Sequence, residues 1–397
     1  MIDFKLISVD DHVNEHPAAW ERAQREFGER APHIIENPPE LGKGLWIIAE
    51  GLPPVRSAYF ALGHVVEKPE GISQMTVMED HERFRKQIID FNENFRYQDW
   101  PAGWEPSARL KDMDRDGVEA AVFFSSPTRF NYSNNDAKFQ RAIFRSYNAW
   151  LLDFCNYNRK RLIAMPLISI LDVDLAVADM KEYAKAGCHA VQLPSTIAGS
   201  GYYEAGYEPL WQTAQDLGLL LTIHSGTGQG QKRKKVGEAR AGDLRARVID
   251  MNRPLPAVSF ISNLIFSGVF DRYPALKVMC TEFDACWVAG MIQRLDYQFG
   301  RESTYDAELN VNKLNPSEYV RRNVFFSIGD DRAAVLGTPL FGADNFIWGG
   351  DYPHHVTSWP YSRENLAANC EGFSDSLARK LGRENAIRIY NLDLSME

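Results

Sequence analysis

Long apolar runs are missing from this chain of 397 residues. No stretch approaches the roughly 20 apolar residues that a membrane-spanning helix needs, and the chain does not open with a basic segment followed by an apolar one. Cysteine is also scarce: five residues are scattered along the chain without a CxxC pair, which is typical of reduced thiols. These absences predict a protein of the cytoplasm that contacts no membrane.

Positive charge is in deficit, because 44 Lys and Arg stand against 53 Asp and Glu and give a net charge of -9. This balance argues against nucleic acid as a partner. The one basic run, residues 231–235, is interpreted as a solvated loop. Hydrophobic residues make up 45% of the chain and aromatic residues 12%, which is enough for a large core. We therefore expect a single domain over residues 1–397.

Short apolar runs of the kind that form buried strands recur along the chain, and segments with helical patterns separate them. Such alternation is typical of repeated βα units. The expected strands cover residues 6–9, 118–124, 162–167, 189–194, 219–223, 277–281, 324–328 and 345–348. Eight strands with helices between them predict an α/β fold, a (β/α)8 TIM barrel.

A long stretch at about residues 30–75, after the first expected strand, is rich in proline and glycine and shows no helical or strand pattern. Connections of this length in a compact domain are usually functional covers or linkers. The stretch contains Trp46, Tyr59 and Phe60, and such aromatic content favours a cover. We expect a cap-like insertion over the active-site face of the barrel.

Aspartate, glutamate or histidine residues follow four of the expected strands. Asp10 and His12 follow the first strand, His224 the fifth, Glu282 the sixth and Asp351 the eighth. The carboxyl ends of all strands meet at one face of a closed barrel, so these side chains are expected to share a pocket. Carboxylates and neutral imidazoles are ligands for a divalent metal, which this set predicts.

These candidate ligands differ in the roles that they could take. Glu282 could bind a metal, bridge two metals, or hydrogen-bond a histidine ligand. Asp351 follows two glycines and is the best candidate for a general base on a metal-activated water. Alternation directs only one of the next two histidines toward the pocket, and we take His354 as the second catalytic residue. His189 precedes the fourth strand, at the opposite end of the barrel, and is interpreted as structural.

Five segments resemble motifs of one family in the correct order: residues 7–15, 109–118, 266–277, 344–354 and 384–390. The family is the amidohydrolase superfamily, in particular the amidohydrolase-related branch that includes aminocarboxymuconate-semialdehyde decarboxylase and the resorcylate decarboxylases. The resemblance covers nearly the whole chain. It implies a metal-dependent TIM barrel in which the substrate enters over the strand ends.

The resemblance also implies a ligand set, namely Asp10, His12, His224 and Asp351, for a mononuclear or dinuclear centre of Zn, Mn or Fe. Glu282 stands where several decarboxylases of the branch carry a histidine. For that reason we rank hydrolysis of a C–N or C–O bond in a small carboxylate or aromatic substrate first. The alternatives are non-oxidative decarboxylation, oxygenation at a dinuclear iron or iron-manganese centre, and an inactive barrel that serves as a structural partner subunit.

Two further expectations concern the partners of the chain. A homodimer is expected from the resemblance alone, with a related barrel subunit as the other possibility. Trp46, Tyr59 and Phe60 of the insertion, with Arg56 nearby and Arg233 in the loop after the fifth strand, suggest an aromatic or apolar acid as the substrate.

Overall fold

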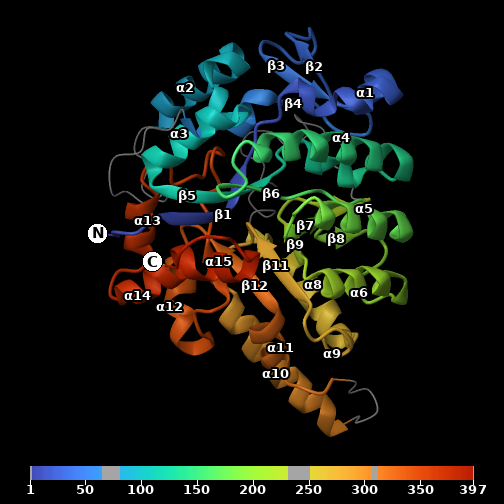
Figure 1. Ribbon diagram of the computed structural model, residues 1–397, viewed down its shortest axis with the longest axis vertical. Coiled ribbons are helices and arrows are strands. Elements are labelled where there is room, and N and C mark those ends of the chain that lie inside the picture. Colours follow the sequence, from blue (N-terminus) through green and yellow to red (C-terminus); the bar gives the residue numbers. More distant parts are fainter. Residues whose placement is uncertain (1, 65–80, 231–250, 306–311, 397) are drawn as a thin grey trace.

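The structure is a computed structural model that describes residues 2–64, 81–230, 251–305 and 312–396. Eight parallel strands lie at its centre (Figure 1). They are β1 (Leu6–His12), β5 (Val118–Phe124), β6 (Leu162–Ala164), β7 (Ala190–Leu193), β9 (Leu220–His224), β11 (Lys277–Thr281), β12 (Val324–Ile328) and β13 (Phe346–Trp348). Each one coincides with an expected strand within three residues at either end, so the predicted α/β fold is confirmed.

The strands follow one another in chain order. One sheet has the order β1-β5-β6, and the other has the order β7-β9-β11-β12-β13. A parallel bridge between Leu167 and Gln192 links β6 to β7. On the other side, the amide of Asp351 donates to the carbonyl of Asp10 at 2.6 Å and links the loop after β13 to β1. With both links present, the first and last strands are neighbours, as an eight-stranded α/β barrel requires.

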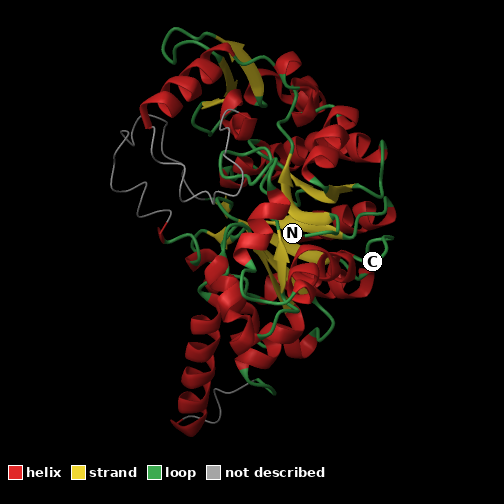
Figure 2. Ribbon diagram, turned by 90° about the vertical axis from the view of Figure 1, so that its left-hand side faces the viewer, coloured by secondary structure: helices red, strands yellow, loops and turns green. Residues whose placement is uncertain are grey.

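Helices connect the strands and cover the outside of the sheets. Figure 1 shows α4, α5 and α6 along one side of the strands, and α10 projects from the body in Figures 1 and 2. The helices are α1 (Glu21–Phe27), α2 (His81–Asn94), α3 (Pro106–Asp116), α4 (Ala137–Asn156), α5 (Val173–Lys185), α6 (Glu208–Leu217), α8 (Leu255–Phe266), α9 (Val269–Arg272), α10 (Val288–Tyr305), α11 (Pro316–Asn323), α12 (Arg332–Phe341), α13 (Ser362–Asn369), α14 (Asp375–Arg379) and α15 (Asn385–Tyr390). In the described part of the chain, no helix is long and apolar enough to span a bilayer.

Local sequence signals explain where the helices begin and end. Asp136 and Asp172 precede α4 and α5, and each side chain accepts a hydrogen bond from a backbone amide of the first turn. This capping satisfies donors that have no partner inside the helix. Gly218 ends α6 with a left-handed φ of 65°, a conformation that glycine adopts without steric cost.

The interior of the barrel is filled by apolar side chains from all eight strands, among them Val9, Val122 and Met279. The same cluster includes Ile387 and Tyr390 of α15, which lies across the strands in Figure 1. This last helix therefore packs onto the core from the end of the barrel opposite to the candidate site. A second and larger cluster lies between the strands and the outer helices.

A register shift between Ser8 and Asp11 interrupts the pairing of β1 with β5. Ser8 pairs with Ala121 and Asp11 with Phe123, so β1 advances by three residues where β5 advances by two, as in a β-bulge. Val9 packs in the barrel interior, and strict alternation from Val9 would direct Asp11 inward and His12 outward. The extra residue reverses this order, so His12 pairs with Phe124 and points inward while Asp11 points outward.

The insertion after β1 forms a small antiparallel sheet where the sequence predicts irregular chain. Its strands are β2 (His33–Glu36), β3 (Leu45–Ile48) and β4 (Val55–Arg56). They are too short to give a periodic signal in the sequence. In Figure 2 this sheet lies at the opposite end of the molecule from α10. Residues 65–75 of the predicted cap lie outside the described residues.

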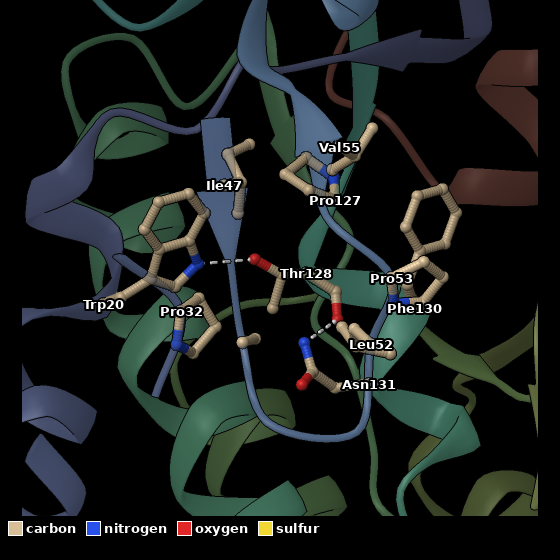
Figure 3. Close-up of a pocket in the computed structure, with 11 residues that line it drawn as sticks. Trp20, Pro32, Ile47, Leu52, Pro53, Val55, Pro127, Thr128, Phe130 and Asn131 are labelled. Atoms are coloured by element: carbon tan, nitrogen blue, oxygen red, sulfur yellow. Dashed lines mark hydrogen bonds between the residues drawn. The ribbon is translucent and has the colours of Figure 1, made fainter. Parts of the chain in front are cut away.

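The insertion packs against the loop that follows β5. Figure 3 shows Ile47 and Val55 of the insertion facing Pro127 and Thr128 across an apolar pocket. The indole Nε1 of Trp20 donates to Thr128 Oγ1 at 2.8 Å. Thr128 is also the first residue of a 3-10 helix, Thr128–Ser133, in the loop after β5. The insertion thus supports a loop at the carboxyl end of the barrel.

We expect Gly349→Ala to destabilise the protein, because a Cβ at residue 349 would lie 2.5 Å from Asp10 Cβ. Overpacking of this kind costs about 1–3 kcal/mol. Gly329→Ala is the matched control, since it follows the neighbouring strand β12 and its added Cβ would find its nearest atom at 3.7 Å. Urea unfolding monitored by circular dichroism measures both. Equal stability of the two variants would contradict the close approach of β13 to β1.

Candidate metal centre

Four predicted ligands meet at the carboxyl ends of the strands. His12 Nε2 lies 3.6 Å from Asp10 Oδ1 and 3.3 Å from Asp351 Oδ1. His224 ends β9, and its Nε2 lies 3.3 Å from Asp10 Oδ1. These side chains come from the first, fifth and eighth strands of the barrel and are buried. The structure thus brings together residues more than 300 positions apart in the chain.

The facing atoms of this cluster have no hydrogen-bond partner. The set comprises Asp10 Oδ1, His12 Nε2, His224 Nε2 and both carboxylate oxygens of Asp351. Unpaired buried polar atoms are costly, and lone pairs that face one another repel. Four ligand atoms about 2.1 Å from one metal ion, at tetrahedral angles, would be about 3.4 Å apart. The observed separations match this spacing, so the residues fit a divalent cation.

Burial keeps the two histidines of this set neutral. Burial, followed by the positive charge of Arg129, lowers the pKa of His224 to about 4. Burial also lowers the pKa of His12 well below its ordinary value, and His354 adds to the effect. Near neutral pH both imidazoles therefore carry a lone pair. A neutral imidazole is the form that binds a metal.

Glu282 contacts His224 from the side away from the cluster. Its Oε2 lies 3.2 Å from His224 Nδ1 and accepts a hydrogen bond from Ser225 Oγ at 2.8 Å. Burial opposes ionisation, but His224, Arg129 and Arg253 together lower the pKa of Glu282 to about 2. The carboxylate can therefore orient His224 and raise the basicity of its other nitrogen. Of the three roles that the sequence left open, this geometry favours the hydrogen-bonding one.

Two adjacent histidines after β13 have different surroundings. His354 is buried, its Nδ1 lies 2.8 Å from Asp351 Oδ1, and its ring stacks on His12 with the centroids 3.9 Å apart. His355 is exposed, and its ring lies 6.0 Å from that of Tyr59. His354 also belongs to a second possible metal-binding group with His12 and Asp351. In the described part of the chain, both such groups include His12.

Arg129 was not among the predicted site residues, yet it lies against the cluster. It is buried, and its Nη1 donates to the carbonyl of Ser125 at 2.5 Å and lies 3.1 Å from His12 Nδ1. The positive charge of Arg129 acts to lower the pKa values of Asp10, His224 and Asp351. Its position shortly after the second strand is the only sequence signal that could have revealed it.

A buried ion pair supports His12 from outside the barrel. Asp11 points away from the cluster and accepts a hydrogen bond from Ser8 Oγ at 2.6 Å. Arg109 lies 3.7 Å from Asp11 and donates to the carbonyl of His12 at 2.6 Å. Because a buried guanidinium is costly to leave unpaired, this contact helps to fix the backbone at the end of β1.

The three aromatic residues predicted to contact a substrate lie in different environments. Trp46 packs beneath the guanidinium of Arg56, which lies 4.6 Å from the ring centroid, within the insertion itself. Phe60 is buried with its ring 6.1 Å from that of His354, at the candidate site. Tyr59 is partly exposed. Arg233 and the basic run lie outside the described residues.

A family model described as amidohydrolase matches residues 52–392. The chain belongs to this amidohydrolase family. Because the match covers most of the chain and the ligand positions are intact, the protein is a metal-dependent enzyme of the amidohydrolase superfamily. The resemblance to the amidohydrolase superfamily is thereby confirmed.

Two relatives of this amidohydrolase are decarboxylases by name. Over 294 residues it is 24% identical to 2-amino-3-carboxymuconate-6-semialdehyde decarboxylase of Dictyostelium discoideum, an alignment that covers 73% of this chain and 77% of that protein. It is 22% identical over 346 residues to gamma-resorcylate decarboxylase of a Polaromonas species, covering 80% of this chain and 98% of that protein.

A solved structure shares the fold of this amidohydrolase. It is 5-carboxyvanillate decarboxylase of Novosphingobium aromaticivorans, in complex with manganese and 4-hydroxy-3-methoxy-5-nitrobenzoic acid. The TM-score is 0.65 at 17% identity, and the match covers 98% of this chain and 97% of that chain.

We expect the purified protein to contain a divalent metal, and we expect His224→Ala to lose more than 90% of it, roughly the effect of removing one of four ligands. His189→Ala is the control, because His189 precedes β7 at the opposite end of the barrel. Metal analysis by mass spectrometry after purification without added metal measures both. Equal metal content in the two variants would contradict the ligand assignment.

Glu282→Gln should weaken metal binding by about 10–100-fold without abolishing it. Mutation of a residue that hydrogen-bonds a metal-binding histidine usually lowers metal affinity by this amount. Titration with zinc in competition with a chelator measures the affinity. A loss as complete as that of His224→Ala would instead identify Glu282 as a ligand.

Proposed function

We propose that this protein is a metal-dependent, non-oxidative decarboxylase of a small carboxylic acid with an aromatic or similarly conjugated body. The observation that carries the proposal is that both relatives, aligned over 73% and 80% of this chain, are decarboxylases by name. The sequence alone ranked hydrolysis first, and the relatives favour decarboxylation instead. The structural neighbour bound to a substituted benzoic acid supports an aromatic substrate.

Asp10, His12, His224 and Asp351 would hold the metal, and manganese is the first choice because the structural neighbour binds it. When bound, a divalent cation acts as a Lewis acid that polarises oxygen atoms of the substrate. The mixed set of carboxylate and imidazole ligands suits manganese, iron and zinc alike. Metal identity is therefore open to direct measurement.

Decarboxylation requires a proton donor at the site. The bond between the substrate carbon and its carboxylate breaks, carbon dioxide leaves, and the electron pair stays on the carbon, which then takes a proton. Asp351 Oδ1 and His354 Nδ1 lie 2.8 Å apart, which is close enough for a proton to pass between the two groups once they align. We assign this pair as the general acid.

Two guanidinium groups suit an anionic substrate. Arg129 lies against His12, and Arg253 lies 3.7 Å from Glu282. Their charges offset those of the site carboxylates, which would otherwise repel a carboxylic acid in its ionised form. Arg253 lines the pocket above the cluster together with Asp10, Glu282 and Asp351. A carboxylate that enters this pocket would meet the guanidinium of Arg253.

We expect the manganese-loaded protein to release carbon dioxide from at least one of gamma-resorcylate, 5-carboxyvanillate and 2-amino-3-carboxymuconate-6-semialdehyde. In D2O, one deuterium should appear at the vacated carbon for each carbon dioxide released, as mass spectrometry can measure. Hydrolysis of an amide or ester panel without any release of carbon dioxide would overturn the proposal in favour of hydrolysis.

His354→Gln should lower kcat by about 100-fold or more, since a positioned general acid contributes roughly this much. His355→Gln is the matched control, because the adjacent side chain is exposed and its loss should leave kcat within about twofold of wild type. Steady-state kinetics of carbon dioxide release compare the two. Equal losses would exclude His354 from the general-acid pair.

A further inference from the structure

One polar face of α3 contacts two segments that carry candidate metal ligands. Arg109, Asp112 and Asp116 follow one another at intervals of three and four residues, so they lie on one side of the helix. Arg109 donates to the carbonyl of His12 at 2.6 Å. Asp116 accepts hydrogen bonds from the amide and the hydroxyl of Ser362, at 2.9 and 2.6 Å. This face therefore binds both β1 and the segment that follows β13.

Asp112, the middle residue of this face, holds the neighbour of a ligand. Its carboxylate accepts a hydrogen bond from the hydroxyl of Tyr352, and its backbone carbonyl accepts one from Trp359 Nε1 at 3.2 Å. The guanidinium of Arg109 lies over the Tyr352 ring, 4.6 Å from the ring centroid. The side chain of Tyr352 is thus fixed by α3 at both its ring and its hydroxyl.

The backbone of Tyr352 lies between two of the candidate ligands. Its carbonyl accepts a hydrogen bond from the amide of His12 at 2.7 Å, and Asp351 directly before it donates to the carbonyl of Asp10 at 2.6 Å. Asp351 has a φ of 50°, in the left-handed region that residues other than glycine keep only where surrounding contacts hold them. A shift of Tyr352 would therefore pass directly to the Asp351 carboxylate, which lies 3.3 Å from His12 Nε2.

We propose that Asp112 is a positioning residue for the metal centre. Through the hydroxyl of Tyr352 it holds Asp351 in its left-handed conformation, and so sets the position of this carboxylate relative to His12. This proposal rests on the proposed function only where that takes Asp351 and His12 as metal ligands. Metal affinity is its direct consequence and can be measured without turnover.

A second buried pair of tyrosine and aspartate provides a matched control. The hydroxyl of Tyr319 donates to Asp271 Oδ2 at 2.7 Å, and Tyr319 is buried in the cluster between the strands and the outer helices. Tyr319→Phe therefore removes the same kind of hydrogen bond away from the metal centre. A bond that only stabilised the fold would affect unfolding in both places and metal affinity in neither.

The test is titration of the purified variants with zinc in competition with a chelator, with thermal unfolding measured alongside. Tyr352→Phe and Asp112→Ala should each weaken zinc binding about tenfold, the lower end of the range for residues that orient a ligand. Asp112→Asn keeps an acceptor oxygen and should bind zinc nearly as tightly as wild type. Tyr319→Phe should lower the unfolding temperature and leave the zinc affinity unchanged.

A double variant checks that the bond between the two side chains is the cause. Asp112→Ala combined with Tyr352→Phe should bind zinc no more weakly than Asp112→Ala alone, because both changes break the same bond. Losses that multiply would mean that the two residues act separately, and would overturn the proposal.

The remaining outcomes separate this proposal from the proposed function. Unchanged zinc affinity in Tyr352→Phe overturns the positioning role, and so does an equal loss in Tyr319→Phe. A wild-type protein that binds no zinc overturns the positioning role together with the ligand assignment. The expected affinities in a protein that hydrolyses an amide or ester and releases no carbon dioxide support the positioning role and overturn only the proposed function.

Discussion

The organisation of this molecule depends on a set of buried lone pairs that face one another without a donor between them. Asp10, His12, His224 and Asp351 direct unpartnered oxygen and nitrogen atoms at one point, with separations of 3.3 to 3.6 Å along the contacts that join them. Such an arrangement is unfavourable unless a cation occupies the centre. The surrounding structure must therefore hold these four side chains against their mutual repulsion whenever the metal is absent.

Several independent restraints supply this rigidity. The bulge in β1 turns His12 inward, and Arg109 binds its carbonyl from the other side. Glu282 holds His224 through its Nδ1. The loop after β13 is tied to β1 through the amide of Asp351. Together these restraints act on the carboxyl ends of three strands, β1, β9 and β13. This is how a rigid barrel positions metal ligands that come from separate elements.

The strands and the convergence of the candidate ligands could be predicted from sequence because both depend on local patterns. Apolar runs mark the strands, and a carboxylate or histidine directly after such a run marks the site. The bulge could not be predicted in this way, since simple alternation from Val9 would have directed Asp11 inward. Arg129 escaped prediction because arginine is common in loops, and its contact with His12 joins residues 117 positions apart. The short strands of the insertion are stabilised by packing against the barrel rather than by their own pattern.

The last helix has a consequence for how the protein is made. Ile387 and Tyr390 of α15 complete the interior cluster to which β1 contributes Ile7 and Val9. Ligands near both ends of the chain, at residues 10 and 351, depend on that core for their positions. During synthesis on the ribosome, the first strand emerges long before its neighbour β13 and before α15. The metal centre can therefore assemble only after residue 390 has left the ribosome, so a nascent chain stalled before that point would expose an unfinished core to chaperones and proteases.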